Sequence, residues 1–212
     1  MPTRPIIQCY YTLSSPWAYF AGPRLGDIIR RHGAELILKP YDFQAVVPKT
    51  GGIPIRTRPL PRQEYHAVEL RRWSEYLGMP LNPKPQHYPP SDNKTPGHTV
   101  IAAQAAGYDA PRLSHAILRA IWAEERNVAL AATRKEIADE NEMDGDELIE
   151  LEISDAVVFE YQRNTDEVEQ LGIFGAPTYL LNGELFWGQD RLEFLDRALA
   201  QACYAGPHSF NG

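Results

Sequence analysis

Residues 6–22 read IIQCYYTLSSPWAYFAG and change from a strand pattern to a helix pattern within a few positions. The run IIQCYY is rich in β-forming residues, and it ends at a pair of serines. Pro16 follows, and proline is favoured at the first helical position because the N–H it lacks would have no intrahelical partner there. Apolar residues then recur at helical spacing. The stretch therefore predicts a strand, a tight turn and a helix, with Ser15 as the N-cap.

The predicted position of Ser15 is one that can favour the binding of an anion. The hydroxyl of an N-cap serine lies over unpaired backbone N–H groups at the positive end of the helix dipole. Such a place is suited to holding an anion. A serine in this position can also be a cap and nothing more, and these residues alone leave both interpretations open.

The two ends of the chain predict the pieces of one sheet. A second strand at residues 35–41 completes a βαβ unit, which implies parallel strands joined by a right-handed crossover. Near the other end, residues 178–181 and 184–187 predict a hairpin, because Asn182-Gly183 between them is a strong two-residue turn sequence. A last helix follows the hairpin. The order predicts an α/β fold with a single four-stranded sheet.

The middle of the chain predicts helices inserted between these two sheet-forming ends. The predicted helices are residues 62–77, 98–106, 110–125, 133–141 and 153–171. The fourth of them opens with a Thr133–Glu136 capping box. Proline-rich, loop-like segments at residues 44–61 and 79–97 flank the first of these inserted helices, residues 62–77.

Composition and charge exclude several classes of function. Hydrophobic residues make up 43% of the chain and charged residues 23%, which is typical of a globular protein. The net charge of −7 argues against nucleic acid or an anionic membrane as partner. No apolar run approaches the ~20 residues of a membrane span. Without a secretory pattern or a C-x-x-C motif, we expect a cytoplasmic, reducing compartment.

Two sets of polar residues stay open to interpretation. Arg56, Arg58 and Arg62 stand close together, either as part of a solvated loop or as a contact for an anion. The six histidines are scattered along the chain, so we predict no metal site and interpret most of them as surface or core residues.

Four motifs, taken together, resemble those of a known family. They are SPWAY at residues 15–19, RRW at 71–73, FGAPT at 174–178 and FWGQDR at 186–191. The chain resembles 2-hydroxychromene-2-carboxylate isomerases, which belong with kappa-class glutathione transferases in the DsbA-like group. The resemblance extends from about residue 6 to residue 199.

The resemblance implies a thioredoxin-like fold with an all-helical insertion. Residues 1–43 and 172–203 would form the thioredoxin-like domain, residues 44–171 the helical insertion domain, and residues 204–212 a loose tail. It also implies a homodimer.

The resemblance further implies where the sulfur of glutathione binds. Ser15 would replace the reactive cysteine of disulfide oxidoreductases and bind the glutathione sulfur. The neighbouring Ser14 is the alternative, and Ser15 is preferred because it directly precedes the proline. Ala176 and Pro177 would form a cis-proline turn whose backbone pairs with the cysteinyl unit of glutathione.

Other implied contacts concern the remainder of glutathione. Gln189 and Asp190 would meet the γ-glutamyl group, although Asp190 can also be a plain N-cap of the last helix. Arg62 stands near a position where the family carries a lysine. The sequence departs from the family at Thr12 and Leu13, where an acidic residue is usual.

The implied activity is a glutathione-dependent isomerisation of a 2-hydroxychromene-2-carboxylate-like intermediate of aromatic degradation. Thiolate addition, ring opening and expulsion of the thiol would accomplish it, with arginines of the 56–62 segment holding the carboxylate. The alternatives are a kappa-type transferase or peroxidase acting on other small electrophiles, and a non-catalytic glutathione-binding module. A thiol–disulfide oxidoreductase is disfavoured because a serine cannot form a mixed disulfide.

Overall fold

A four-stranded mixed sheet unites the two ends of the chain. The computed structural model describes residues 4–204, and the predicted tail lies outside them apart from its first residue. The strands are β1 (Ile6–Tyr11), β2 (Glu35–Pro40), β3 (Thr178–Leu181) and β4 (Glu184–Trp187). Their order is β2-β1-β3-β4, with β1 parallel to β2 and antiparallel to β3. Gln8 faces Leu180 in the register, so the predicted single sheet is confirmed.

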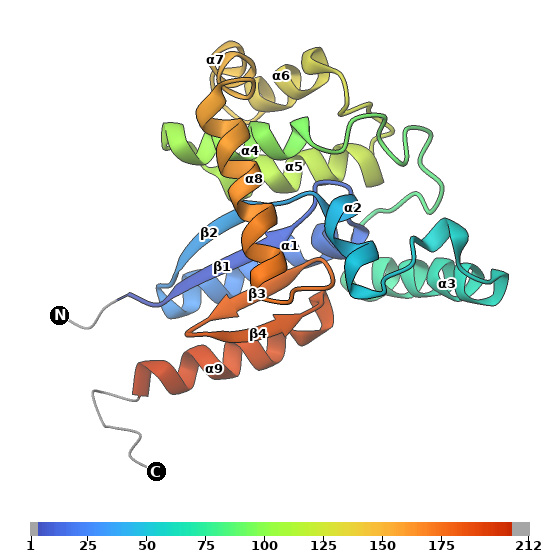
Figure 1. Ribbon diagram of the computed structural model, residues 1–212, viewed down its shortest axis with the longest axis vertical. Helices are drawn as coiled ribbons and strands as arrows, with labels where there is room; N and C mark the ends of the chain where they lie inside the picture. The colour runs from blue at the N-terminus through green and yellow to red at the C-terminus, as the bar shows by residue number, and fades with distance from the viewer. Residues whose placement is uncertain (1–3, 205–212) are drawn as a thin grey trace.

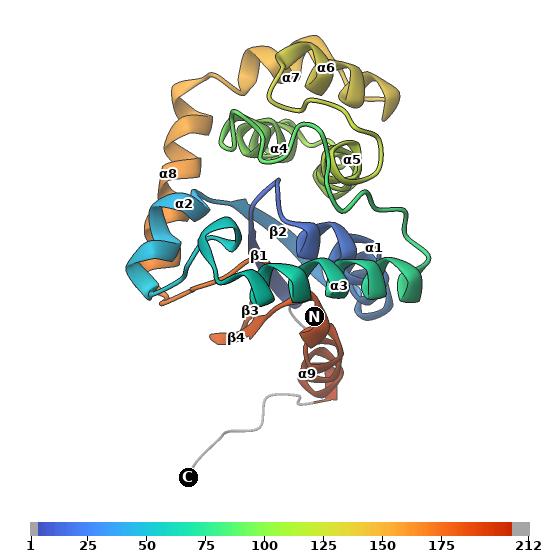
Figure 2. The same ribbon diagram turned by 90° about the vertical axis from the view of Figure 1, so that its right-hand side faces the viewer.

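Helices surround this sheet on both faces (Figure 1). They are α1 (Pro16–His32), α2 (Phe43–Val46), α3 (Leu60–Leu77), α4 (Thr95–Ala106), α5 (Ala110–Trp122), α6 (Ala131–Glu140), α7 (Gly145–Leu151), α8 (Asp155–Gln170) and α9 (Leu192–Tyr204). α1 packs against α5, α9 and α3, and α8 crosses β2. α6 and α7 lie farthest from the sheet, beyond α4 and α5 (Figure 2).

Two predicted capping arrangements are wrong, and no helix is predicted where α7 lies. α5 also ends at Trp122, before the predicted residue 125. α6 begins at Ala131 with Leu130 as its N-cap, so Thr133 lies inside the helix and forms no capping box. Asp190 does not cap the last helix from outside, because a short 3₁₀ turn at Gln189–Arg191 precedes α9 and contains it. The Asp190 carboxylate instead accepts a hydrogen bond from Arg191 at 2.6 Å.

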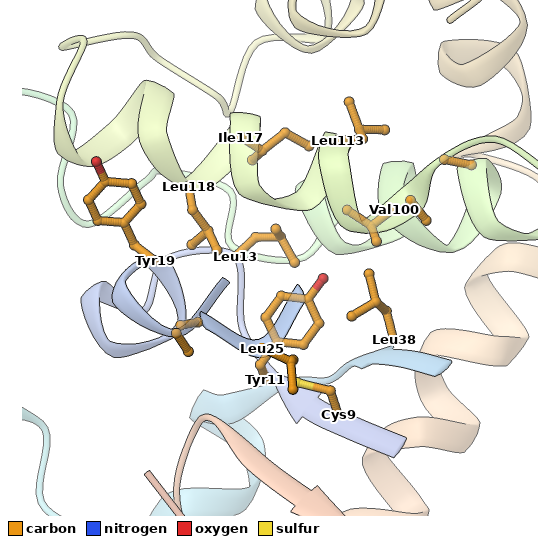
Figure 3. Packing of buried hydrophobic residues seen from close by; sticks show 14 of the residues in the cluster. Cys9, Tyr11, Leu13, Tyr19, Leu25, Leu38, Val100, Leu113, Ile117 and Leu118 are labelled. Atoms are coloured by element: carbon orange, nitrogen blue, oxygen red, sulfur yellow. The ribbon is translucent and has the colours of Figure 1, made fainter. Parts of the chain in front are cut away.

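The alternation of β1 divides its side chains between two faces of the sheet. Ile7, Cys9 and Tyr11 belong to a large buried cluster that continues into α4 and α5, as Figure 3 shows for the labelled Cys9 and Tyr11. Tyr10 points the other way and packs with Val168 of α8. The inserted helices therefore share one continuous core with the sheet, which fixes them relative to it.

A buried ion pair stabilises the outer helices. Arg134 of α6 donates to both carboxylate oxygens of Glu152 at 3.0 and 2.5 Å, and both side chains are at most 3% exposed. Thr99 of α4 donates to the same carboxylate. The pair thus connects α6, α4 and the segment that leads into α8.

We predict that Arg134→Ala destabilises the protein by about 3–5 kcal/mol, because the buried Glu152 carboxylate would be left without a charged partner. Arg119→Ala is the matched control: Arg119 is 53% exposed and pairs with Glu124 at the surface. Loss of that pair should cost under about 1 kcal/mol. Urea unfolding of both variants measures the difference, and equal losses would contradict the assignment.

Candidate functional site

The turn between β1 and α1 holds Ser15 in a fixed position. The Ser15 N–H donates to the Thr12 carbonyl at 3.1 Å, which closes the turn. The Ser15 hydroxyl accepts from the Ala18 N–H at 3.2 Å, and Pro16 starts the helix. The predicted N-cap is therefore confirmed. Ser15 is only 8% exposed, so the hydroxyl lies at the edge of the interior and at the positive end of α1.

The turn before β3 lies directly against Ser15. The Ala176–Pro177 peptide bond is cis, as the resemblance implied. The Ser15 hydroxyl donates to the Ala176 carbonyl at 3.5 Å, the outer limit of a hydrogen bond. Its hydrogen is therefore held weakly and can turn towards a better acceptor.

Glycine is required next to this turn. A Cβ on Gly175 would lie 2.2 Å from the indole nitrogen of Trp187, so a side chain there would displace the tryptophan. Thr178 fixes the same turn from the other side, because its hydroxyl donates to the Gly175 carbonyl at 2.8 Å. These contacts explain why the sequence GAPT occurs at the start of β3.

A cavity of about 430 Å³ opens beside these two turns. Ser14, Ser15 and Ala176 line one side of it, so both candidate serines face the same space. The other walls come from the β2–α2 junction, the segment before α3, α3 itself, the segment between α3 and α4, and α8. Their contributions include Tyr41, Asp42, Phe43, Ile53, Arg56, Arg58, His66, Tyr88, Asn93 and Tyr161.

Backbone contacts hold the two arginines of this wall. Arg56 donates to the Tyr88 carbonyl and Arg58 to the Ile53 carbonyl, each at 2.7 Å. The Gln63 amide of α3 donates to the main-chain carbonyls of both arginines. Within residues 4–204 neither guanidinium has a carboxylate partner, so both charges remain available to a ligand in the cavity.

His66 is a cavity residue that the sequence interpretation missed. It projects from α3, which passes alongside the start of α1 (Figure 2), and its ring meets Trp17 edge-on with centroids 5.4 Å apart. Burial lowers the pKa of His66, and the charge of Arg58 lowers it further. No local pattern marks this histidine, because only the packing of α3 on α1 brings it to the cavity.

The remaining predicted site residues do not line the cavity. Arg62 is exposed on the first turn of α3, apart from the walls that carry Arg56 and Arg58. Gln189 is 3% exposed, and its side-chain oxygen accepts from Arg24 at 2.7 Å. The Asp190 carboxylate is 47% exposed.

A second, much smaller cavity of about 60 Å³ lies between β1, α1 and α5. Cys9 and His115 line it, together with Tyr179. Burial raises the pKa of the Cys9 thiol, which keeps it protonated and unreactive. This cavity therefore offers no thiolate chemistry.

The match to a family of known domains gives the class to which this protein belongs. The profile of the DSBA-like thioredoxin domain matches residues 6–200, so the chain belongs to this family. The thioredoxin-like fold with inserted helices is thereby confirmed.

Particular relatives lie within this family. The chain is 29% identical to a 2-hydroxychromene-2-carboxylate isomerase of Sphingobium xenophagum over 195 residues, which covers 91% of this chain and 97% of that one. It is 27% identical to glutathione S-transferase kappa 2 of Caenorhabditis elegans, with 98% and 96% covered. These matches confirm the resemblance that the motifs indicated.

Solved structures show the same architecture. A 2-hydroxychromene-2-carboxylate isomerase superposes with a TM-score of 0.77 at 24% identity, covering 93% of this chain and 96% of that one. The cytosolic disulfide reductase DsbM of Pseudomonas aeruginosa, in a structure with GSH, gives 0.64 at 19% identity, covering 94% and 96%.

None of the helices between residues 4 and 204 has both the length and the apolar character that crossing a membrane requires. Within the same residues, no three histidine, cysteine or acidic side chains cluster as metal ligands.

Proposed function

We propose that the protein is a glutathione-dependent isomerase acting on an aromatic carboxylate similar to 2-hydroxychromene-2-carboxylate. One observation carries the proposal: the Ser15 hydroxyl and the Ala176 carbonyl border the same cavity as Arg56 and Arg58. The relatives named as isomerases support the choice of reaction.

The residues at the start of α1 fit the thiol end of glutathione. When bound, glutathione would supply a thiolate that adds to a conjugated carbon of the substrate and is released again. A free thiol is mostly protonated at neutral pH. The weakly engaged Ser15 hydroxyl and the positive end of α1 favour the charged form, because both interact more strongly with a thiolate than with a thiol. The exposed Asp190 carboxylate remains accessible to the γ-glutamyl ammonium group.

The cavity lining contributed by the segment before α3 fits the substrate. Arg56 and Arg58 offer guanidinium N–H groups to a carboxylate, a pairing that is commonly bidentate. The apolar side chains Trp17, Phe43 and Ile53 line the same cavity as these arginines and Ser15. This arrangement suits a flat aromatic acid with a carboxylate at one end and an electrophilic carbon near Ser15.

A kappa-type transferase is the second candidate, because the kappa relative shares almost the whole length of the chain. It would use the same thiolate site with a different electrophile. Assays with a chromene carboxylate and with an uncharged electrophile separate the two, since only the isomerase regenerates glutathione without forming a conjugate.

We predict that Ser15→Ala raises the pKa of the bound glutathione thiol and slows turnover about 10–150-fold. This loss corresponds to one charge-assisted hydrogen bond of roughly 1.5–3 kcal/mol. The variant also loses an N-cap, at a cost of about 1 kcal/mol in stability. Thiolate absorbance as a function of pH measures the pKa, and steady-state kinetics measure turnover.

Three variants separate the two roles of Ser15. Ser15→Asn keeps a cap of similar strength but not the hydroxyl. Ser154→Ala removes the equivalent cap of α8, where Ser154 accepts from the Val157 N–H, and should leave the thiol pKa unchanged. If Ser14→Ala, rather than Ser15→Ala, abolished turnover, the sulfur would bind one residue earlier.

We predict that Arg56→Gln and Arg58→Gln each raise KM for the carboxylate substrate by about 10–150-fold, the loss of one hydrogen bond to a charged group. Both should leave KM for glutathione and for an uncharged electrophile unchanged. Arg62→Gln is the matched control, since Arg62 does not line the cavity. Should Arg62→Gln alone impair glutathione binding, the contact implied by the family lysine position would be right.

The proposal includes a homodimer in the cytoplasm. A glutathione thiol must stay reduced to act, which fits the compartment expected from the cysteine pattern. Light scattering at micromolar concentration should give twice the mass of the chain. A monomer would contradict the dimer and leave the assignment of the site intact.

A further inference from the structure

We propose that His66 is the proton-transferring residue of the cavity. It would take the proton of the substrate's hemiketal hydroxyl and return it to the ring oxygen when the ring opens. The inference rests on the proposed isomerisation and assigns a role to a side chain that no motif marked.

The position of His66 gives it access to a bound substrate. It lines the cavity together with Ser15 and Arg58. Trp17, two residues after Ser15, holds the ring by an edge-on contact. Within residues 4–204 neither ring nitrogen makes a hydrogen bond to the protein. The imidazole is therefore fixed in place by packing, while its donor and acceptor remain free for a ligand.

The charge state of His66 suits a base. Burial and Arg58 lower the pKa of the imidazole below its ordinary value of 6.5, so the ring is neutral at neutral pH. A neutral imidazole accepts a proton at one nitrogen, and the positive charge of Arg58 favours the release of that proton from the resulting cation. General acid–base catalysis of this kind contributes about 10²–10⁴-fold to a rate.

The other ionisable groups around the cavity leave this state unchanged. The tyrosines that line it stay protonated, since burial raises the pKa of each; they are Tyr41, Tyr88 and Tyr161. Burial alone would raise the pKa of Asp42, but hydrogen bonds from Lys94 and two backbone N–H groups lower it, and Lys94 neutralises its charge at 2.8 Å.

On the helix of His66 itself, two charged residues lie about one turn away. Arg62 precedes His66 and is exposed to solvent. Glu69 follows it, and its carboxylate is held by Arg72 at 2.7 Å. Trp17, the contact from α1, does not titrate. No carboxylate is therefore poised to hold His66 in the charged form.

The reaction needs one such proton carrier. In a 2-hydroxychromene-2-carboxylate, the hydroxyl and the ring oxygen share one carbon. Ring opening breaks the O–H bond and the carbon–ring oxygen bond, and the O–H electron pair forms the new carbonyl. The pair of the broken ring bond stays on the ring oxygen, which takes up a proton as a phenol. One proton leaves and one arrives, so a single imidazole balances the step without any oxidant or reductant.

Imidazole rescue of His66→Ala tests this role. We expect turnover of the chromene carboxylate to fall about 10²–10⁴-fold. The glutathione Kd from calorimetry and the pKa of the bound thiol should stay unchanged. Added imidazoles should restore turnover in the order of their basicity, which a purely structural residue would not show. The pKa of His66 itself, followed by NMR, should lie below 6.5 and coincide with an acid limb of kcat that the variant lacks.

His115→Ala is the matched control. His115 is also half-buried with a lowered pKa and stacks on Tyr19, but it lines the small cavity beside Cys9. The His115→Ala variant should keep the wild-type turnover number per folded molecule. Full activity of His66→Ala, or a loss of activity together with glutathione binding and without imidazole rescue, would overturn the proposal. A wild-type protein that fails to isomerise the substrate would instead overturn the proposed function, and this inference with it.

Discussion

The hydrogen bonds of one hydroxyl connect the parts of the molecule on which the site depends. Ser15 accepts from the first turn of α1 and donates across 161 positions of sequence to the Ala176 carbonyl. The same contact joins the β1–α1 turn to the turn before β3, and β1 and β3 are the two strands along which the halves of the sheet pair. The fold thus holds the hydroxyl in position. Because the hydrogen bond that it donates is long and weak, its hydrogen remains available to a ligand.

The electrostatics of the cavity differ from those of the whole chain. In a protein with a net charge of −7, Arg56 and Arg58 at the cavity have no carboxylate partner among residues 4–204, while Lys94 neutralises the carboxylate of Asp42. Backbone carbonyls hold these arginines without neutralising their charge, because a carbonyl is itself uncharged. This part of the cavity lining therefore stays positive. An anionic substrate would thus be drawn to the cavity even though the surface as a whole repels it.

Local patterns predicted the parts of the structure that are determined locally. The strand–turn–helix at residues 6–22 and the hairpin around Asn182-Gly183 follow from short-range preferences, so their positions could be inferred. The start of α6 could not, because Leu130 caps it without any side-chain bond that a motif would record. The placement of His66 and the exclusion of Arg62 from the cavity depend on how α3 packs on α1, which no sequence period encodes.

The proposed function depends on Ser15 and Ala176 together binding the cysteinyl part of glutathione. A crystal structure of the protein soaked with glutathione tests this claim most directly. We expect the sulfur within hydrogen-bonding distance of the Ser15 hydroxyl and the cysteinyl backbone paired with Ala176. A sulfur bound to the Ser14 hydroxyl, or a tripeptide lying outside the cavity beside Ser15, would contradict it.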